Sequence, residues 1–309
     1  YSKQESRLLF EAGAIYHATS VAGILVAAGL DTNSQGMYFQ GKLLSWNSGS
    51  DLTEMPSAVY SNNLRISNHS YSKAQGWGGY EQNPLGTNLL RVWYGDMAID
   101  PYQDYRFGFY GYEAYQLDYT ASVNPHYLGI WAAGNERGAD GQAPSGGSTE
   151  GHVAYYNAAP IYSEFPHNSS DGDFGGYDTL LPHQVAKNTL VVGSVTTNLS
   201  VSGFSSLGPT DDGRIKPDIM AVGEGVQATS YNQGTHSVSG TSFAAPVVAG
   251  GLNLLDQLWH LLDTNRRMQD HDLVLLPQSN FRFFLGFSRN VESGPGLTTV
   301  QLFDSRGDQ

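Results

Sequence analysis

The stretch SGTSFAAPVVAGGLNLL, residues 239–255, joins a Gly-Thr-Ser turn to an apolar run that predicts a buried helix continuing to about Leu262. Ser242 stands at the mouth of this helix, where unpaired backbone N–H groups and the positive end of the helix dipole point outward. Gly240 permits a sharp approach to the helix, and Pro246 falls in its first turn, where a missing N–H costs little. An ordinary N-cap explains Ser242 alone, but the same environment also stabilises a developing oxyanion.

Two other polar residues stand at comparable turns. His17 precedes a helical pattern in HATSVAG, residues 17–23, where the helix dipole disfavours imidazolium and keeps the ring available as a base. Asn135 follows a strand-like run and a glycine in LGIWAAGNE, residues 128–136, so its amide can donate a hydrogen bond to an oxyanion. Each also has an ordinary explanation, His17 as a packing histidine and Asn135 as a turn residue.

Strand-like and helical patterns alternate along the chain, which predicts an α/β fold. Compact apolar runs at residues 127–133 and 189–195 predict buried strands. Residues 14–30 predict a turn followed by a helix whose small side chains allow close packing on a sheet. Residues 43–46 and 58–67 predict further units of the sheet.

Turn-forming residues dominate two long segments between these patterns. Residues 76–124 are rich in Tyr, Gly and Asp and predict long surface excursions or an insertion. Residues 138–177 are dominated by Gly, Ser, Asp, Asn and Pro and predict mostly loop. The chain shows no internal repeat and no clear linker, which favours one domain with long loops.

The motifs around His17, Asn135 and Ser242, in this order, resemble those of the subtilases, the subtilisin-like serine proteases. The family's signatures read H-G-T-x-V-A-G, A-A-G-N and G-T-S-x-A-A-P. Three further segments resemble the family's sequence after the histidine helix, at the substrate-pairing strand and before the nucleophile: residues 36–46, 66–72 and 204–223. The likeness covers about residues 14–262.

This resemblance implies a three-layer subtilisin-like fold, a mostly parallel sheet with helices on both faces. It also implies a serine endopeptidase in which Ser242 is the nucleophile, His17 the general base and Asn135 an oxyanion donor. The substrate is then an extended polypeptide that pairs with the enzyme as an added strand. The residues implied to bind it are Asn68, Ser70, Tyr71, Ser72, Trp131, Ala132, Ala133 and Gly134.

The family's third catalytic residue, an aspartate on the first core strand, has no visible counterpart ahead of His17. Residues 1–16 read YSKQESRLLFEAGAIY and contain no aspartate. We therefore expect the aspartate-bearing strand to be missing and the peptidase domain, residues 1–262, to be N-terminally incomplete. Glu11 is an alternative carboxylate, whereas Asp31 follows a helix and comes after the histidine, so we do not assign it this role.

Smaller departures from the family pattern occur elsewhere. Ala18 and Ser72 stand where the family usually has glycine, and both add atoms near a crowded backbone. Residues 263–309 do not resemble the family's closing helix and strand, so we treat them as a separate C-terminal segment. Residues 273–285 predict strand-like structure within it.

Composition and net charge limit the classes of partner that this chain can bind. The 309 residues include 16 Lys and Arg against 29 Asp and Glu, and the formal net charge of −13 repels nucleic-acid phosphates and anionic membranes. No apolar run approaches the roughly 18 residues that a membrane span needs. The absence of cysteine excludes disulfides and thiolate metal sites. We expect polypeptide substrates, no nucleic acid and no membrane insertion.

Location and regulation follow from the resemblance alone. It implies an extracellular or cell-envelope protease, with a propeptide or an inhibitor as a further partner. No charged-then-apolar leader follows Tyr1, so we expect no signal peptide in this sequence.

The acidic loop DGDFGGYD, residues 171–178, carries oxygen ligands at alternating positions, as calcium loops do. Its candidate ligands are Asp171, Asp173 and Asp178. Subtilases often bind calcium, but the stretch lacks a full ligand set, so a solvated turn is favoured and we expect no cofactor.

Two other functions stay open. A subtilase-like module that lacks the aspartate would bind peptides in the same cleft without cutting them. An α/β hydrolase or a carbohydrate-active protein would suit the tyrosine-rich acidic surface, but the chain has no G-x-S-x-G elbow and no carboxylate pair in a recognisable catalytic context.

Overall fold

The structure is a computed structural model that describes residues 15–46, 48–82, 89–100, 103–138, 152–156, 159–163, 175–232, 234–262, 284–286 and 301–303. Its helices are α1 (Ile15–Val26), α2 (Asp51–Asn62), α3 (Tyr112–Val123) and α4 (Thr241–Leu262), with 3₁₀ turns η1 (Thr32–Ser34) and η2 (Ser48–Ser50). Its strands are β1 (Ile66–His69), β2 (Trp77–Gln82), β3 (Leu89–Trp93), β4 (Leu128–Ala132), β5 (His152–Tyr156), β6 (Ala159–Ser163), β7 (Leu190–Val195), β8 (Ile219–Val222), β9 (Val226–Thr229), β10 (Thr235–Val238), β11 (Phe284–Gly286) and β12 (Gln301–Phe303).

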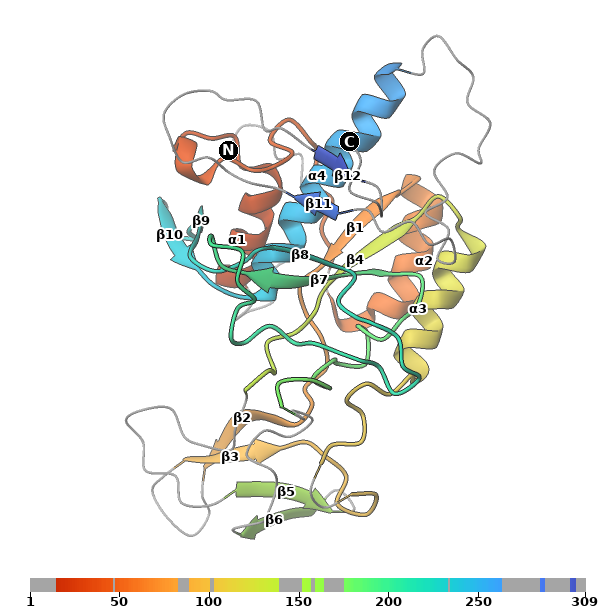
Figure 1. Ribbon diagram of the computed structural model, residues 1–309, viewed down its shortest axis with the longest axis vertical. Coiled ribbons are helices and arrows are strands. Elements are labelled where there is room, and N and C mark those ends of the chain that lie inside the picture. Colours follow the sequence, from red (N-terminus) through yellow and green to blue (C-terminus); the bar gives the residue numbers. More distant parts are fainter. Residues whose placement is uncertain are drawn as a thin grey trace.

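A four-stranded parallel sheet in the order β1-β4-β7-β8 lies at the centre of the molecule (Figure 1). Strands β4 and β7 fall within the apolar runs that predicted buried strands. These runs are apolar throughout because a parallel sheet is covered on both faces. In register, Ile66 of β1 lies opposite Leu128 of β4, and Ile130 of β4 lies opposite Leu190 of β7.

Successive residues of β4 point to opposite faces of this sheet and contact different helices. Ile130 and Ala132 pack in one cluster with residues of α4 and with Leu25 of α1. Trp131 packs on the other face, in a cluster with residues of α2 and α3. The expected three-layer α/β fold, with a parallel sheet between helices, is therefore confirmed.

Helix α1 packs against α4 and against the antiparallel hairpin β9–β10, so the small residues do allow close packing on a sheet, as predicted. Gly23 makes this approach close, since a Cβ there would lie 2.0 Å from Thr229 Oγ1. The same hydroxyl donates to Thr19 O at 2.9 Å, which fixes α1 to the hairpin. No helix in the described ranges has both the length and the apolar character that a membrane crossing requires.

A second four-stranded sheet, in the order β2-β3-β5-β6, is formed by strands that the sequence patterns did not indicate. Its strands lie within residues 76–124, expected to form long surface excursions or an insertion, and within residues 138–177, of which only part is described. It lies beyond one end of the central sheet (Figure 1). Strands β2 and β3 belong to the connection that follows β1, whereas β5 and β6 belong to the connection that follows β4. Strands β3 and β5 pair in parallel, so the two connections are joined into one sheet.

The predicted sheet units at residues 43–46 and 58–67 were largely wrong. Residues 43–46 form no strand, and 58–62 lie in α2, so that only the end of the second segment enters β1. Helix α2 buries Met55, Ala58 and Val59, which follow the helical spacing of three and four residues. Pairing of a strand requires a neighbour, and no described strand lies beside residues 43–46.

The C-terminal segment, residues 263–309, is described only at β11 and β12. These strands pair antiparallel, with Phe284 opposite Phe303. Residues 273–283 of the predicted strand-like stretch lie outside the described residues.

The buried carboxylate of Asp118 on α3 anchors the chain that leads into β7. It accepts hydrogen bonds from the backbone of Lys187 at 2.9 Å and of Asn188 at 2.7 Å, and from the Tyr110 hydroxyl at 2.6 Å. Asp118→Ala leaves two backbone N–H groups without acceptors, so we expect the free energy of unfolding to fall by about 3 kcal/mol in urea titrations.

The matched control is Asp256→Ala, which removes the partly exposed ion pair with Arg65. A surface pair of this kind contributes less than about 1 kcal/mol. Equal losses for the two variants would contradict the anchoring role of Asp118.

Candidate active site

Ser242 lies in the first turn of α4, half-buried, and contacts the chain just after β1. Its Oγ lies 3.4 Å from Ser70 O, and the Ser70 hydroxyl donates to Ser242 O at 2.8 Å. These two contacts fix the start of α4 beside the carboxyl end of β1. The serine therefore sits where helix N–H groups and strand ends converge, a common location for ligand sites in parallel sheets.

Asn135 follows β4 and is oriented by Thr241, the first residue of α4. Asn135 Oδ1 accepts a hydrogen bond from Thr241 N at 2.9 Å, and the Thr241 hydroxyl lies 3.1 Å from the same oxygen. A backbone N–H can only donate, so the amide atom of Asn135 that faces Thr241 N is the oxygen. The other amide atom, Nδ2, can then donate to other groups. Gly134, with φ of +105°, permits the turn that brings Asn135 here.

His17 lies exposed in the first turn of α1, next to the residue that follows the serine. Its ring centroid is 5.4 Å from that of Phe243. Desolvation by neighbouring atoms lowers the pKa of His17 below its usual 6.5, which favours the neutral ring. The described ranges show no hydrogen bond from His17 to Ser242 or to a carboxylate.

Two carboxylates were considered as partners of His17, namely Glu11 and Asp31. Glu11 lies outside the described residues. Asp31 caps η1, where it accepts from Asn33 N at 3.0 Å, and it also accepts from the Thr235 hydroxyl at 3.2 Å. Asp31 therefore serves the turn after α1, in keeping with its exclusion from the catalytic assignment.

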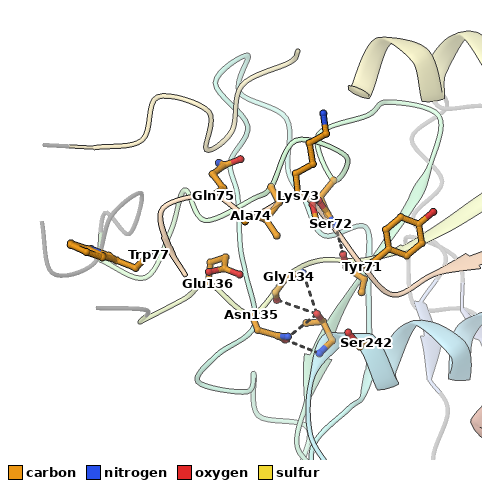
Figure 2. A pocket seen from close by; sticks show the side chains of 14 residues that line it. Tyr71, Ser72, Lys73, Ala74, Gln75, Trp77, Gly134, Asn135, Glu136 and Ser242 are labelled. Carbon is orange, nitrogen blue, oxygen red and sulfur yellow. Dashed lines mark hydrogen bonds between the residues drawn. The ribbon is translucent and has the colours of Figure 1, made fainter. Parts of the chain in front are cut away.

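A pocket of about 300 Å³ opens beside Ser242 and Asn135 (Figure 2). Four of the residues implied to bind substrate line it, namely Tyr71, Ser72, Ala132 and Gly134. Thr241 of the Gly-Thr-Ser turn and Glu136, next to Asn135, also line it. Lining residues that the motifs did not indicate are Lys73, Ala74, Gln75, Trp77, Leu181 and Gln184, which come from the two connections that follow β1 and β4.

The other implied substrate-binding residues lie outside the lining of this pocket. The Asn68 amide donates to the Ser70 hydroxyl at 3.0 Å. Trp131 and Ala133 are wholly buried in the core on the α2 and α3 side of the sheet. His17 is also outside the lining of this pocket.

An aromatic stack contacts Tyr71, one of the residues that line the pocket. Trp131 lies between His69 and His183, with ring centroids 4.4 Å and 4.7 Å apart and nearly parallel planes. His69 is buried, and its ring nitrogens lie 2.6 Å from Ser67 Oγ and 2.9 Å from Tyr71 Oη. Burial, with a contribution from His183, lowers the pKa of His69 to about 3, so the ring is neutral in the folded protein.

The calcium candidates are only partly described. Asp171 and Asp173 lie outside the described residues. Burial, together with the nearby Asp211, raises the pKa of Asp178 to about 6. The described part of the chain groups no three His, Asp or Glu side chains in a way that could hold a metal ion, so calcium at this loop stays a prediction.

A parallel sheet between two helical layers, with a serine at the first turn of a buried helix and an asparagine beside it, places this chain in the class of three-layer α/β proteins, a class that includes serine hydrolases. The chain belongs to the subtilase family, whose sequence pattern matches residues 11–271. The resemblance seen in the motifs is thereby confirmed over most of the chain.

Curated relatives match over shorter stretches. The mouse membrane-bound transcription factor site-1 protease is 38% identical over 85 residues, 26% of this chain and 8% of that protein. The C5a peptidase of Streptococcus pyogenes serotype M18 is 44% identical over 61 residues, 20% of this chain and 5% of that protein. The matches thus span less than a tenth of the length of these relatives.

Among solved structures, the Clostridium perfringens CspB protease superposes with a TM-score of 0.53 at 17% identity. The superposition covers 82% of this chain and 72% of that one. At this identity the likeness concerns the fold.

The buried neutral His69 makes stability depend on pH. Its pKa is about 3 when folded and near 6.5 when unfolded, so the unfolded chain binds more protons between these values. Stability is full above pH 6.5 and falls as the pH drops toward 3, by about 1.4 kcal/mol per pH unit from this residue. Urea titrations at pH 7, 6, 5 and 4 measure the slope.

The variant His69→Gln keeps side-chain hydrogen bonding but has no proton to gain. We expect its free energy of unfolding to fall less steeply with acid, by about the same 1.4 kcal/mol per unit. Parallel slopes for the two proteins would contradict the assignment of this acid sensitivity to His69.

Proposed function

We propose that this chain is a serine endopeptidase in which Ser242 is the nucleophile, His17 the general base and Asn135 an oxyanion donor. The observation that carries the proposal is the orientation of Asn135 by Thr241, the residue before the serine. A donor amide and a helix N-terminus then face the same reacting atom, which is what a tetrahedral intermediate of acyl transfer requires.

In this mechanism Ser242 Oγ forms a bond to the carbonyl carbon of the peptide, and its proton passes to the neutral ring of His17. The carbonyl oxygen becomes an oxyanion held by Asn135 Nδ2 and the Ser242 backbone N–H. When the C–N bond breaks, His17 returns the proton to the leaving amine. Water then hydrolyses the acyl ester by the same steps in reverse order.

The proposed substrate is an extended polypeptide that pairs, as an added strand, with the parts of segments 68–72 and 131–134 that extend beyond the paired residues of β1 and β4. The contact between Ser242 and Ser70 supports this placement, because it puts the reacting hydroxyl at the end of β1. A side chain of the substrate would enter the adjacent pocket. An extracellular or cell-envelope location, a propeptide or inhibitor as partner and the domain limit at residue 262 are parts of the same proposal and rest on the family resemblance.

A second candidate is a peptide-binding module that does not cut its ligand. It is favoured by the surroundings of His17, whose pKa responds to desolvation alone in the described part of the chain. Without a carboxylate partner the imidazolium formed during the reaction is less stabilised, and turnover is slower.

Reaction with a fluorophosphonate probe distinguishes the two candidates. We expect covalent labelling that is lost in Ser242→Ala and slowed roughly a hundredfold or more in His17→Ala, because a general base accelerates attack by this factor. Ser237→Ala, on the exposed strand β10, is the matched control and should label normally. Labelling that persists in Ser242→Ala would contradict the nucleophile, and no labelling of the natural sequence would favour the binding module.

The pH dependence of labelling tests the base. Because the pKa of His17 is lowered, the ring loses its proton at a lower pH than an ordinary histidine. We expect the labelling rate to fall with acid and to reach half of its maximum at a pH below 6.5. A midpoint above 6.5 would contradict this and indicate a carboxylate beside the ring.

A further inference from the structure

Gln75 differs from the other polar residues of the pocket because its amide has no partner. The side chain is 2% exposed, and neither Oε1 nor Nε2 finds a hydrogen bond within the described part of the chain. It lines the same pocket as Ser242, and Figure 2 shows it on the side of Gly134 and Asn135 away from the serine. A buried amide without partners costs free energy, and a ligand that supplies both partners removes that cost.

The neighbouring polar groups of the pocket already satisfy one another. The Ser72 hydroxyl donates to Gln184 Oε1 at 3.2 Å, and Gln184 Nε2 donates to Ala132 O at 2.7 Å. Lys73 forms an ion pair with Glu113. The amide of Gln75 is therefore the donor and acceptor that this wall offers to a ligand.

The backbone beside Gln75 is held in place, so the side chain cannot easily turn to solvent. Gly76 N donates to the buried Asp104 carboxylate at 2.9 Å, and Gly76 O accepts from Tyr94 N at 2.9 Å. Asp104 is itself paired with Arg106. Trp77 packs against Trp93. A binding group held this way is preorganised.

We infer, on the basis of the proposed function, that Gln75 selects a substrate side chain that ends in a primary carboxamide, glutamine or asparagine, for the pocket beside Ser242. Two amides pair through one N–H donor and one carbonyl acceptor each, which satisfies both atoms of Gln75. A lysine side chain would meet the opposite charge of Glu136, but it only donates and leaves Nε2 unpaired. A carboxylate only accepts, leaves Oε1 unpaired and meets the negative charge of Glu136 on the pocket wall.

Binding of capped peptides tests this inference without requiring cleavage. The probes are acetyl-Ala-Ala-Ala-Xaa-amide with Xaa as Gln, Met, Glu or Lys, titrated calorimetrically into the full chain carrying Ser242→Ala. Met matches Gln in length without its hydrogen bonds, so we expect the Gln peptide to bind roughly tenfold more tightly than the Met peptide. In Gln75→Met, made in the same background, the two peptides should bind equally.

Gln257→Met, on the exposed face of α4, is the matched control and should keep the tenfold preference. Thermal unfolding tests whether Gln75 has a structural role instead, because the loss of a stabilising residue would lower the melting temperature. Because Gln75→Met removes only unpaired polar atoms, its melting temperature should be equal to or above that of the parent. A lower melting temperature, equal binding of the Gln and Met peptides to the parent, or tightest binding of the Lys or Glu peptide would overturn the inference.

Fluorophosphonate labelling of the natural sequence separates this outcome from that of the proposed function. Labelling at Ser242 without preference for the Gln peptide would overturn the role of Gln75 alone. Preference for the Gln peptide without labelling would support Gln75 and overturn the endopeptidase.

Discussion

The hydrogen bonds of Thr241 hold together the two parts of the candidate site. Thr241 is wholly buried, and its N–H and hydroxyl contact Asn135 Oδ1 while the hydroxyl also lies 3.1 Å from Gly134 O. One residue thereby joins the end of β4 to the start of α4. Without this junction the asparagine amide would have no fixed orientation relative to Ser242, and a helix N-terminus alone would be an unspecific anion site.

The second sheet depends on the same end of the central sheet. Its strands come from the two connections that follow β1 and β4. Because β1 and β4 are adjacent and parallel, these connections begin side by side at the carboxyl ends of the two strands. Pairing of β3 with β5 then joins their far ends. A pocket between two connections that are fixed at both ends has walls that resist opening, which suits a site that discriminates between side chains.

Sequence patterns predicted the elements that are marked by a continuous apolar run or by a characteristic turn. The buried strands β4 and β7 appear as continuous apolar runs, and the start of α4 follows from its Gly-Thr-Ser turn. Helix α2 was missed although Met55, Ala58 and Val59 follow helical spacing, because Pro56 interrupts the pattern and Val59 and Tyr60 favour strands. The second sheet could not be predicted, since β3 and β5 pair across about 60 residues and no local pattern encodes that contact.

The same distinction applies within the candidate site. His17, Asn135 and Ser242 stand in motifs because the roles proposed for them require particular turns, which constrain the neighbouring residues. Gln75 stands in no motif, since a pocket wall requires only a side chain of suitable length held at the right place. The neighbouring Gly76 and Trp77 are held by Asp104, Tyr94 and Trp93, contacts that form only when the chain is folded. In the proposed function, the residues of the reaction are thus marked by local sequence, whereas the inferred selectivity depends on tertiary contacts of the connection that follows β1.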